Sequence, residues 1–474
     1  MKNYTTLSSI KLDLLSNETS CSSLVSYYLK QIEINKHLNA FLEVFSGEAI
    51  RAAELIDEKI KAKTAGKLAG MVIGIKDVIC YKDHKVSASS KILEGFVSLY
   101  TSTVVARLLK EDAIIIGRLN CDEFAMGSSN EKSAFGKVLN PIDNKRVPGG
   151  SSGGCVTAVA ANLCLAAIGT DTGGSIRQPA SFAGVVGLKP TYGRVSRYGV
   201  IAYASSFDQV GPITQSVEDA ALILEVISGK DEFDSTLSSK SVEEYSKKLD
   251  FTEKVNVAVF KDCIEHKGLN TEVKEKLIQT IELLKSEGHS VEIVDFPYID
   301  YLVPTYYVLT TAEASSNLSR YDGIHYGYRS KNAVDLESTY KLSRTEGFGT
   351  EVKRRIMLGT FVLSAGYYDA YYSKGQKVRR IIKNKTQVIL NKYDFILLPS
   401  TPNSAFKFGQ NDADPIAMYL EDIFTVQANI TGLPAISLPL GKKTDGLPFG
   451  IQLMGKAFDE SRLLAFSNYL MNKS

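Results

Sequence analysis

Short apolar runs alternate with amphipathic segments along most of the chain, which is the pattern of an α/β protein. Each short apolar run predicts a strand, and the predicted strands are residues 71–75, 113–116, 164–169, 255–260, 291–294, 395–398, 435–438 and 449–454. The segments between them predict helices at 24–34, 46–63, 104–109, 155–161, 216–227, 272–286 and 459–470. This order predicts an α/β fold with a central mixed β-sheet covered by helices on both faces.

Two segments depart from the alternation and shape the expected domain organisation. Residues 8–64 look helical, with Ser22 and Ser23 as the cap of one helix, and residues 304–392 are mostly helical and tyrosine-rich, which predicts a helical insertion. The composition turns polar from about Asp231, so the best candidate boundary or insertion point lies there. We predict a single domain over 1–474, made of N-terminal helices, a core, a strand–helix–strand unit with the helical insertion, and a C-terminal part of the core (1–64, 65–230, 231–392 and 393–474).

The overall composition narrows the class of protein. Hydrophobic residues make up 44% and charged residues 23% of the 474 residues, the proportions of an ordinary soluble protein. A formal net charge of +2 creates no global field that would attract nucleic acid or a membrane surface. Residues 1–20 contain no continuous apolar stretch, so neither a signal peptide nor a membrane span is expected. We expect a cytoplasmic protein with no membrane partner.

The cysteines and histidines do not form a metal-binding pattern. Six cysteines show no CxxC or Cys/His ligand spacing, and the five histidines are scattered away from the glycine-rich loops. We therefore expect reduced, mostly buried thiols and assign no metal ligand. Cys155 lies close to a serine-rich loop, but it opens an apolar segment and is interpreted as a small core residue rather than a nucleophile.

Two glycine–serine loops surround one uncharged segment in the middle of the chain. The first reads PGGSSGG over 148–154, and the second reads TDTGGS over 170–175. Glycine lets backbone N–H groups approach a ligand closely, so serines beside such donors indicate a nucleophile with an oxyanion hole. Each loop taken alone is equally consistent with a turn, a helix cap or a phosphate cradle. The sequence contains no GxxxxGK[ST] motif and no GxGxxG order in these loops, so nucleotide binding is disfavoured.

Lys76 ends an apolar strand in the motif GIKD. A lysine at the end of a core strand is partly desolvated, which lowers its pKa and suits it to accept a proton. The alternative is a lysine that points to water or pairs with Asp77. The lysine alone does not decide between these two interpretations.

Three motifs together resemble the amidase signature family: GIKD, PGGSSGG and the run GTDTGGSIRQPASFAGVVGLKPTYGRVSRYG. The resemblance implies the amidase signature fold and a Ser–cisSer–Lys triad. In that triad Ser175 is the nucleophile, Ser151 follows a cis peptide bond, and Lys76 is the general base. The backbone amides of Thr172, Gly173 and Gly174 are the implied oxyanion hole.

Asp171 and Arg177 flank the predicted nucleophile. A charge-assisted hydrogen bond between them would hold the loop in place without taking part in the chemistry. The alternative is an exposed pair that contributes little. We favour the first interpretation.

The second half of the chain is similar to the glutamine-hydrolysing members of bacterial tRNA-dependent amidotransferases, in segments 306–329, 351–361, 364–372 and 418–441. This similarity implies glutamine as the substrate and a heterotrimer with subunits B and C. It also implies that ammonia passes to a partner subunit that uses ATP and Mg²⁺ on mischarged Glu-tRNA(Gln) or Asp-tRNA(Asn). No cofactor is expected in this chain.

The same similarity implies a glutamine pocket made of three residues. Arg355 would bind the α-carboxylate, Asp422 would bind the ammonium group, and Tyr306 would close the pocket with its hydroxyl. The residues alone allow plainer roles, namely a solvated helix arginine, a helix cap and a core tyrosine. The basic run at 377–385 could touch tRNA phosphates, but its helical spacing favours a solvated face above a core stripe.

Two other functions remain as alternatives. The first is a stand-alone amidase that acts on small amides without partner subunits. The second is a non-catalytic scaffold or RNA-binding protein, which is disfavoured because every position of the implied triad is filled.

Overall fold

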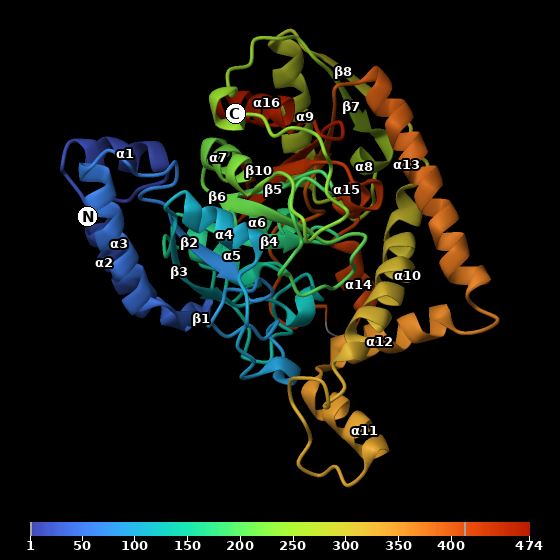
Figure 1. The fold of residues 1–474 in the computed structure, drawn as a ribbon. Helices are drawn as coiled ribbons and strands as arrows, with labels where there is room; N and C mark the ends of the chain where they lie inside the picture. The colour runs from blue at the N-terminus through green and yellow to red at the C-terminus, as the bar shows by residue number, and fades with distance from the viewer. Residues whose placement is uncertain (1, 412–413) are drawn as a thin grey trace.

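A computed structural model describes residues 2–411 and 414–474. Within these residues one 11-stranded sheet runs through the molecule in the order β1-β3-β2-β4-β6-β5-β10-β11-β9-β7-β8 (Figure 1). The strands are β1 Phe41–Val44, β2 Val72–Lys76, β3 Ile114–Leu119, β4 Ala166–Asp171, β5 Val186–Lys189, β6 Gln209–Thr214, β7 Asn256–Phe260, β8 Ser290–Val294, β9 Phe395–Pro399, β10 Ala435–Lys442 and β11 Pro448–Met454.

The sheet is mixed, as predicted. Strand β2 runs parallel to both β3 and β4, and β7 runs parallel to both β8 and β9. The pairs between these two parallel groups are antiparallel. Because β2 and β4 are parallel neighbours, the residues that follow both strands meet at the same edge of the sheet.

Helices flank the sheet (Figure 1). The helices of the first half are α1 Leu7–Leu15, α2 Cys21–Ile34, α3 Ser46–Lys61, α4 Thr103–Lys110, α5 Gly153–Ala160, α6 Arg177–Ala183 and α7 Val217–Ile227. Those of the second half are α8 Lys261–Ile264, α9 Thr271–Ser286, α10 Ile299–Asn317, α11 Leu336–Gly347, α12 Thr350–Leu363, α13 Lys374–Lys392, α14 Pro415–Leu420, α15 Val426–Thr431 and α16 Glu460–Lys473.

Three strands were not predicted from the sequence. Strand β1 interrupts residues 8–64, the region expected to be helical. Strands β5 and β6 lie after the second glycine–serine loop and before the polar stretch that begins at about Asp231. Strands β5 and β6 are buried along their whole length, but their sequences, VGLK and QVGPIT, lack the continuous apolar run that is typical of such strands. Gly211 in β6 lies so close to the Leu188 carbonyl that a side chain would collide with it. Because glycine and polar residues lie inside these buried strands, neither strand shows the short apolar run from which the other strands were predicted.

The N-caps of helices α2 and α7 differ in whether the sequence predicted them correctly. Helix α2 begins earlier than expected, and its cap is Ser20, whose side chain accepts a hydrogen bond from the Ser23 N–H. The prediction of Ser22 or Ser23 was wrong, because Ser22 instead contacts Asp57 on α3. Ser216 caps α7 as predicted.

The polar stretch after Asp231 is tied to the core rather than extended as a linker. Asp231 accepts hydrogen bonds from Ser196 and Thr103, and Asp234 accepts one from the Arg197 N–H. The following strand β7 lies beside β9 in the same sheet, so the strand–helix–strand unit extends the sheet that the first half of the chain begins.

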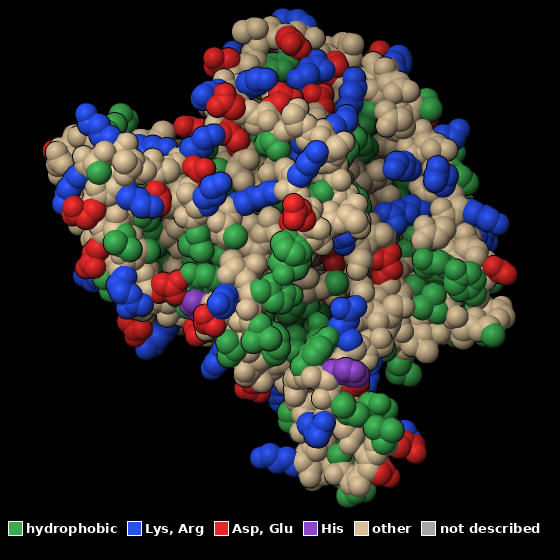
Figure 2. All heavy atoms as spheres, in the orientation of Figure 1, with side chains coloured by type: hydrophobic (Ala, Val, Ile, Leu, Met, Phe, Trp, Pro, Cys, Tyr) green, Lys and Arg blue, Asp and Glu red, His purple; other side chains and the backbone are tan. Residues whose placement is uncertain are grey.

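Residues 304–392 are mostly helical, as predicted, and helices α10, α12 and α13 lie together on one side of the molecule, while α11 projects from it (Figure 1). On the face shown in Figure 2, lysine and arginine side chains intermingle with aspartate and glutamate. No helix among the described residues is both long and apolar enough to cross a membrane.

Candidate active site

Lys76 lies at the end of β2, fully buried beside the end of β4. Its Nζ is 2.8 Å from Ser151 Oγ, 2.9 Å from Ser152 Oγ and 2.9 Å from Thr170 Oγ1. Burial lowers the pKa of this lysine below its ordinary value. The lower pKa makes the neutral amine, the form that can accept a proton from a serine hydroxyl, easier to reach.

Asp77 is not the partner of Lys76, although the two residues are adjacent in sequence. Its carboxylate forms an ion pair with Arg118 at 2.6 Å and accepts hydrogen bonds from the N–H groups of Ser87 and Ser89. Lys76 therefore neither points to water nor pairs with its neighbour, and both plainer interpretations are excluded.

The two serines of the first loop have different surroundings. The Gly150–Ser151 peptide bond is cis, as the family resemblance implied. The Ser151 carbonyl accepts a hydrogen bond from the Asp122 N–H at 3.1 Å, which ties the loop to the segment after β3. The Ser152 hydroxyl donates to the Thr170 carbonyl at 3.2 Å, so it is engaged with the backbone of β4.

Ser175 follows β4 in the second loop and is 7% exposed, in surroundings that are otherwise closed. Its carbonyl accepts a hydrogen bond from the Ser152 N–H at 3.2 Å, which joins the two glycine–serine loops directly. No side-chain hydrogen bond holds the Ser175 hydroxyl among residues 2–411 and 414–474. The hydroxyl is thus free to meet a substrate.

The three residues expected to form the oxyanion hole differ in their contacts. The Gly174 N–H donates to Asp171 Oδ1 at 2.9 Å, so in this structure it is used within the loop. The Thr172 hydroxyl donates to Asp208 Oδ1 at 2.7 Å, and Gly173 lies against the Tyr306 ring. Thr172 and Gly173 therefore stay the better candidates for binding an oxyanion.

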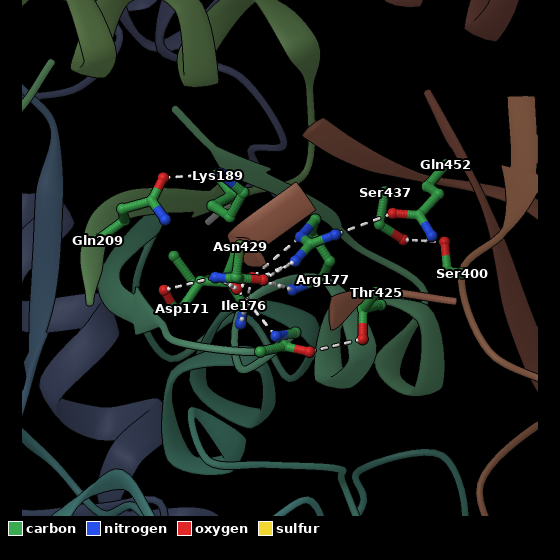
Figure 3. A network of polar contacts seen from close by, with 12 residues as sticks. Asp171, Ile176, Arg177, Lys189, Gln209, Ser400, Thr425, Asn429, Ser437 and Gln452 are labelled. Atoms are coloured by element: carbon green, nitrogen blue, oxygen red, sulfur yellow. Dashed lines mark hydrogen bonds and ion pairs between the residues drawn. The ribbon is translucent and has the colours of Figure 1, made fainter. Parts of the chain in front are cut away.

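Asp171 and Arg177 form a fully buried pair that holds the loop 170–175, called here the nucleophile loop after its predicted nucleophile Ser175 (Figure 3). Burial alone would raise the pKa of Asp171, but the Arg177 guanidinium lowers it to about 2. Arg177 also donates to Asn429 at 2.8 Å and to Gln452 at 2.9 Å. The expected charge-assisted hydrogen bond is present, and the alternative of an exposed pair is excluded.

Thr425 makes a second contact between the C-terminal part of the chain and the nucleophile loop. Its hydroxyl donates to the Gly173 carbonyl at 2.7 Å. Gly174 has φ = 137°, a conformation that only glycine adopts readily, and a side chain there would collide with the Thr425 hydroxyl. The glycine is thus required both by its backbone angle and by its neighbour.

Arg355 lies on α12 and is buried, in contrast to a solvated helix arginine. Its Nη1 donates to the Tyr203 hydroxyl at 2.9 Å, and its Nε donates to Glu351 at 2.8 Å. The guanidinium also lies over the rings of Tyr307 and Tyr419. These contacts fix the position of a cation inside the molecule.

Asp422 lies between α14 and α15 and is also buried. Its carboxylate accepts a hydrogen bond from the Ser128 hydroxyl at 2.6 Å. Burial raises the pKa of Asp422 to about 7. Tyr306 is buried on α10, and its hydroxyl lies close to Gly173 of the nucleophile loop.

A cavity of about 400 Å³ adjoins the Arg355 side chain. Its wall includes Ser128, Glu351, Arg355 and Tyr419, so it reaches the buried arginine and the serine that holds Asp422. The cavity therefore reaches Arg355 and Ser128, and the triad lies outside its wall.

Several residues that contact the site had no local signal in the sequence. Ser128 contacts Asp422, Tyr203 contacts Arg355, Asp208 contacts Thr172, and Thr170 contacts Lys76. Only a folded chain brings these partners together, since they lie between 36 and 294 residues apart in sequence. No group of three or more potential metal ligands is present in the part of the chain that the structure describes. All six cysteines, Cys155 included, are buried and unpaired.

Comparison with known proteins defines the class of this protein. The family model for amidases matches residues 23–464, so the chain belongs to the amidase family. The A subunit of the glutamyl-tRNA(Gln) amidotransferase of Prosthecochloris aestuarii is 48% identical over 462 residues, which cover 97% of each chain. The crystal structure of the corresponding protein from Thermotoga maritima has a TM-score of 0.76 at 41% identity and covers 93% of this chain and 89% of its own.

The fold by itself does not distinguish substrates within the family. A peptide amidase from Stenotrophomonas maltophilia has a TM-score of 0.81 at 28% identity, with 98% of this chain and 96% of that chain covered. The similarity of sequence, rather than of fold, separates the two kinds of relative.

Proposed function

We propose that the chain hydrolyses glutamine as the glutaminase component of a tRNA-dependent amidotransferase. The observation that carries the proposal is the buried Lys76 amine within 2.8 Å of the cis-linked Ser151, in a loop that a backbone hydrogen bond joins to Ser175. The 48% identity over nearly the whole chain to a glutamyl-tRNA(Gln) amidotransferase protein supports the choice of substrate.

The reaction begins when Ser175 Oγ attacks the side-chain amide carbon of glutamine. The Ser175 proton passes to Ser151 Oγ as the Ser151 proton passes to the neutral Lys76 amine. The tetrahedral oxyanion is stabilised by backbone N–H groups of the nucleophile loop, those of Thr172 and Gly173 first. The C–N bond then breaks, the proton held by Lys76 returns to the leaving nitrogen through Ser151, and ammonia departs. Water hydrolyses the glutamyl ester by the same proton path and releases glutamate.

Substrate binding follows from the two buried charges beside the cavity. Arg355 is positioned by Tyr203 and Glu351, and in this proposal it binds the α-carboxylate of glutamine. Asp422 binds the ammonium group, which favours the ionised carboxylate in the complex. Tyr306 closes the pocket near Gly173.

The proposal includes partners outside this chain. Subunits B and C complete a heterotrimer, and a partner subunit uses ATP and Mg²⁺ to convert Glu-tRNA(Gln), or Asp-tRNA(Asn), with the ammonia released here. We place this complex in the cytoplasm, where aminoacyl-tRNA is made. The alternative function is a stand-alone amidase, which would hydrolyse small amides without these partners.

Ser175→Ala tests the proposal in the reconstituted complex. Glutamine-dependent formation of Gln-tRNA is expected to be abolished, because the attacking oxygen is removed, whereas product formation from added ammonium is expected to remain. Lys76→Ala is expected to behave in the same way. The measurement is transamidation of mischarged tRNA with either nitrogen donor.

Two results would contradict the proposal. Retained glutamine hydrolysis by Ser175→Ala would show that another residue is the nucleophile. Full activity of the isolated chain on small amides, with no dependence on partner subunits or aminoacyl-tRNA, would favour the stand-alone amidase.

A further inference from the structure

Gln178 is a fully buried residue of α6, three positions after Ser175, and none of the steps above uses it. Its side-chain Oε1 accepts a hydrogen bond from the Gly150 N–H at 3.0 Å. Its Nε2 donates to the Ser128 carbonyl at 2.8 Å. A backbone donor on one side and a backbone acceptor on the other determine which way the amide faces.

The two partners of Gln178 belong to different parts of the site. Gly150 is the residue on the other side of the cis peptide bond from Ser151, whose hydroxyl contacts Lys76. Ser128 is the residue whose hydroxyl holds Asp422. One neutral side chain therefore connects the proton-relay serine with the residue that contacts the proposed ammonium-binding carboxylate.

The backbone of Gly149 packs closely against Gln178 and Pro179. A side chain on Gly149 would lie 2.5 Å from Gln178 Oε1 and 2.6 Å from the Cα of Pro179. Asp122 supports the same loop from the other side, because its N–H donates to the Ser151 carbonyl and its carboxylate accepts from the Asn130 N–H. Asp122 contacts the loop of Ser151 and the segment 130–132, but it is Gln178 that contacts Ser128.

We infer that Gln178 is a positioning residue that sets the relay serine and the ammonium-binding carboxylate relative to each other. The inference rests on the proposed function, since it assumes glutamine as the substrate. If Gln178 acts on both parts, its loss changes turnover through Ser151 and substrate binding through Ser128. A purely structural residue would change stability alone.

Two substitutions of similar size test this inference in the reconstituted complex. Gln178→Glu keeps an acceptor for Gly150 but removes the donor to Ser128 and places an oxygen against its carbonyl. Gln178→Met removes both hydrogen bonds and keeps the volume. Because buried backbone groups are left without partners, each is expected to lower kcat about tenfold and to raise the KM for glutamine several-fold. The measurement is steady-state glutamine hydrolysis, with ammonium-dependent transamidation as evidence that the complex is intact.

Gln427→Glu is the matched control. Gln427 is also buried, but its side chain donates to Thr386 on α13 at 2.9 Å and does not contact the loops of the site. The substitution introduces the same chemical change, and kcat and KM are expected to stay within about twofold of the parent values.

Two results would contradict the positioning role of Gln178. Values of kcat and KM within about twofold of the parent for both Gln178 variants, with or without a lower unfolding temperature, would overturn the inference. A fall in kcat with an unchanged KM would also overturn it, because the connection to Asp422 would be absent. If one variant does not assemble, the other gives the same comparison. A parent complex that fails to hydrolyse glutamine would instead contradict the proposed function.

Discussion

Single residues acquire their chemistry here from burial. Lys76 and Asp422 carry opposite charges when ionised, and burial favours the neutral form of each. For Lys76 the neutral form is the useful one in the proposed function, because a base must have a free electron pair. For Asp422 the ionised form is the useful one in the proposed function, in which it binds an ammonium group. The same physical effect therefore assists one residue and opposes the other.

If Asp422 binds the ammonium group as proposed, glutamine binding is expected to depend on pH. Its pKa is raised to about 7, so in the free enzyme the carboxyl group becomes protonated as the pH falls below about 7. The value of kcat/KM for glutamine is expected to fall by up to tenfold per pH unit on the acid side, since kcat/KM reports ionisations of the free enzyme. Asp422→Asn is expected to raise the KM for glutamine and to remove this fall in kcat/KM at acid pH. If kcat/KM falls at acid pH in the same way for Asp422→Asn and for the parent enzyme, the ionisation belongs to another group.

Among the elements, the loop between β4 and α6 depends on a distant part of the chain. Arg177 pairs with Asp171 inside the loop and donates to Asn429 on α15 and Gln452 on β11. Both charges are fully buried, so each needs the other to offset the cost of leaving water. The loop is thus held as much by the C-terminal part of the chain as by its own glycines.

Arg177→Met is expected to destabilise the protein by about 3–5 kcal/mol, because it leaves Asp171 as an uncompensated buried charge. Lys341→Met is the control, because Lys341 pairs with Glu337 on the exposed surface of α11. The loss of that pair is expected to cost less than about 0.5 kcal/mol. Thermal unfolding of both variants measures the difference, and equal unfolding temperatures would contradict the structural role of the buried pair.

For the whole molecule, the sheet crosses all four of the segments predicted from the sequence. Strand β5 of the first half pairs with β10 near the C-terminus, with Lys189 opposite Ala435. The polar stretch after Asp231 was the best candidate boundary, but the strands on either side of it belong to one sheet. We therefore propose that the chain folds as one unit.

A fragment of residues 1–230 tests this proposal. Its strand β5 lacks the neighbour β10, and its Arg177 lacks both partners from the C-terminal part. Such a fragment is expected to aggregate through the exposed edge and to show no cooperative unfolding. Gel filtration and thermal unfolding are the measurements. A monomeric fragment with a sharp transition would show that residues 1–230 fold independently.

Much of the fold and part of the site were predictable because their signals are short-range. Most strands and helices follow from local runs of apolar residues. The N-cap of α7 was predicted correctly, whereas that of α2 was not, because the side chain of the predicted cap Ser22 contacts Asp57 instead. Strands β5 and β6 were not predictable, because glycine, proline and polar residues interrupt their apolar runs. Arg355 and Asp422 came from family resemblance alone, since a helix arginine and a loop aspartate look ordinary in sequence.

The sequence by itself determined the two glycine–serine loops, the strand that ends at Lys76 and the family to which these motifs belong. Only the tertiary structure decided that the lysine faces Ser151 rather than Asp77, that the pair of Asp171 and Arg177 is buried, and that Ser128 reaches Asp422. The physical reason is distance along the chain. Strand order and burial set these contacts, and neither can be predicted from a local stretch of sequence.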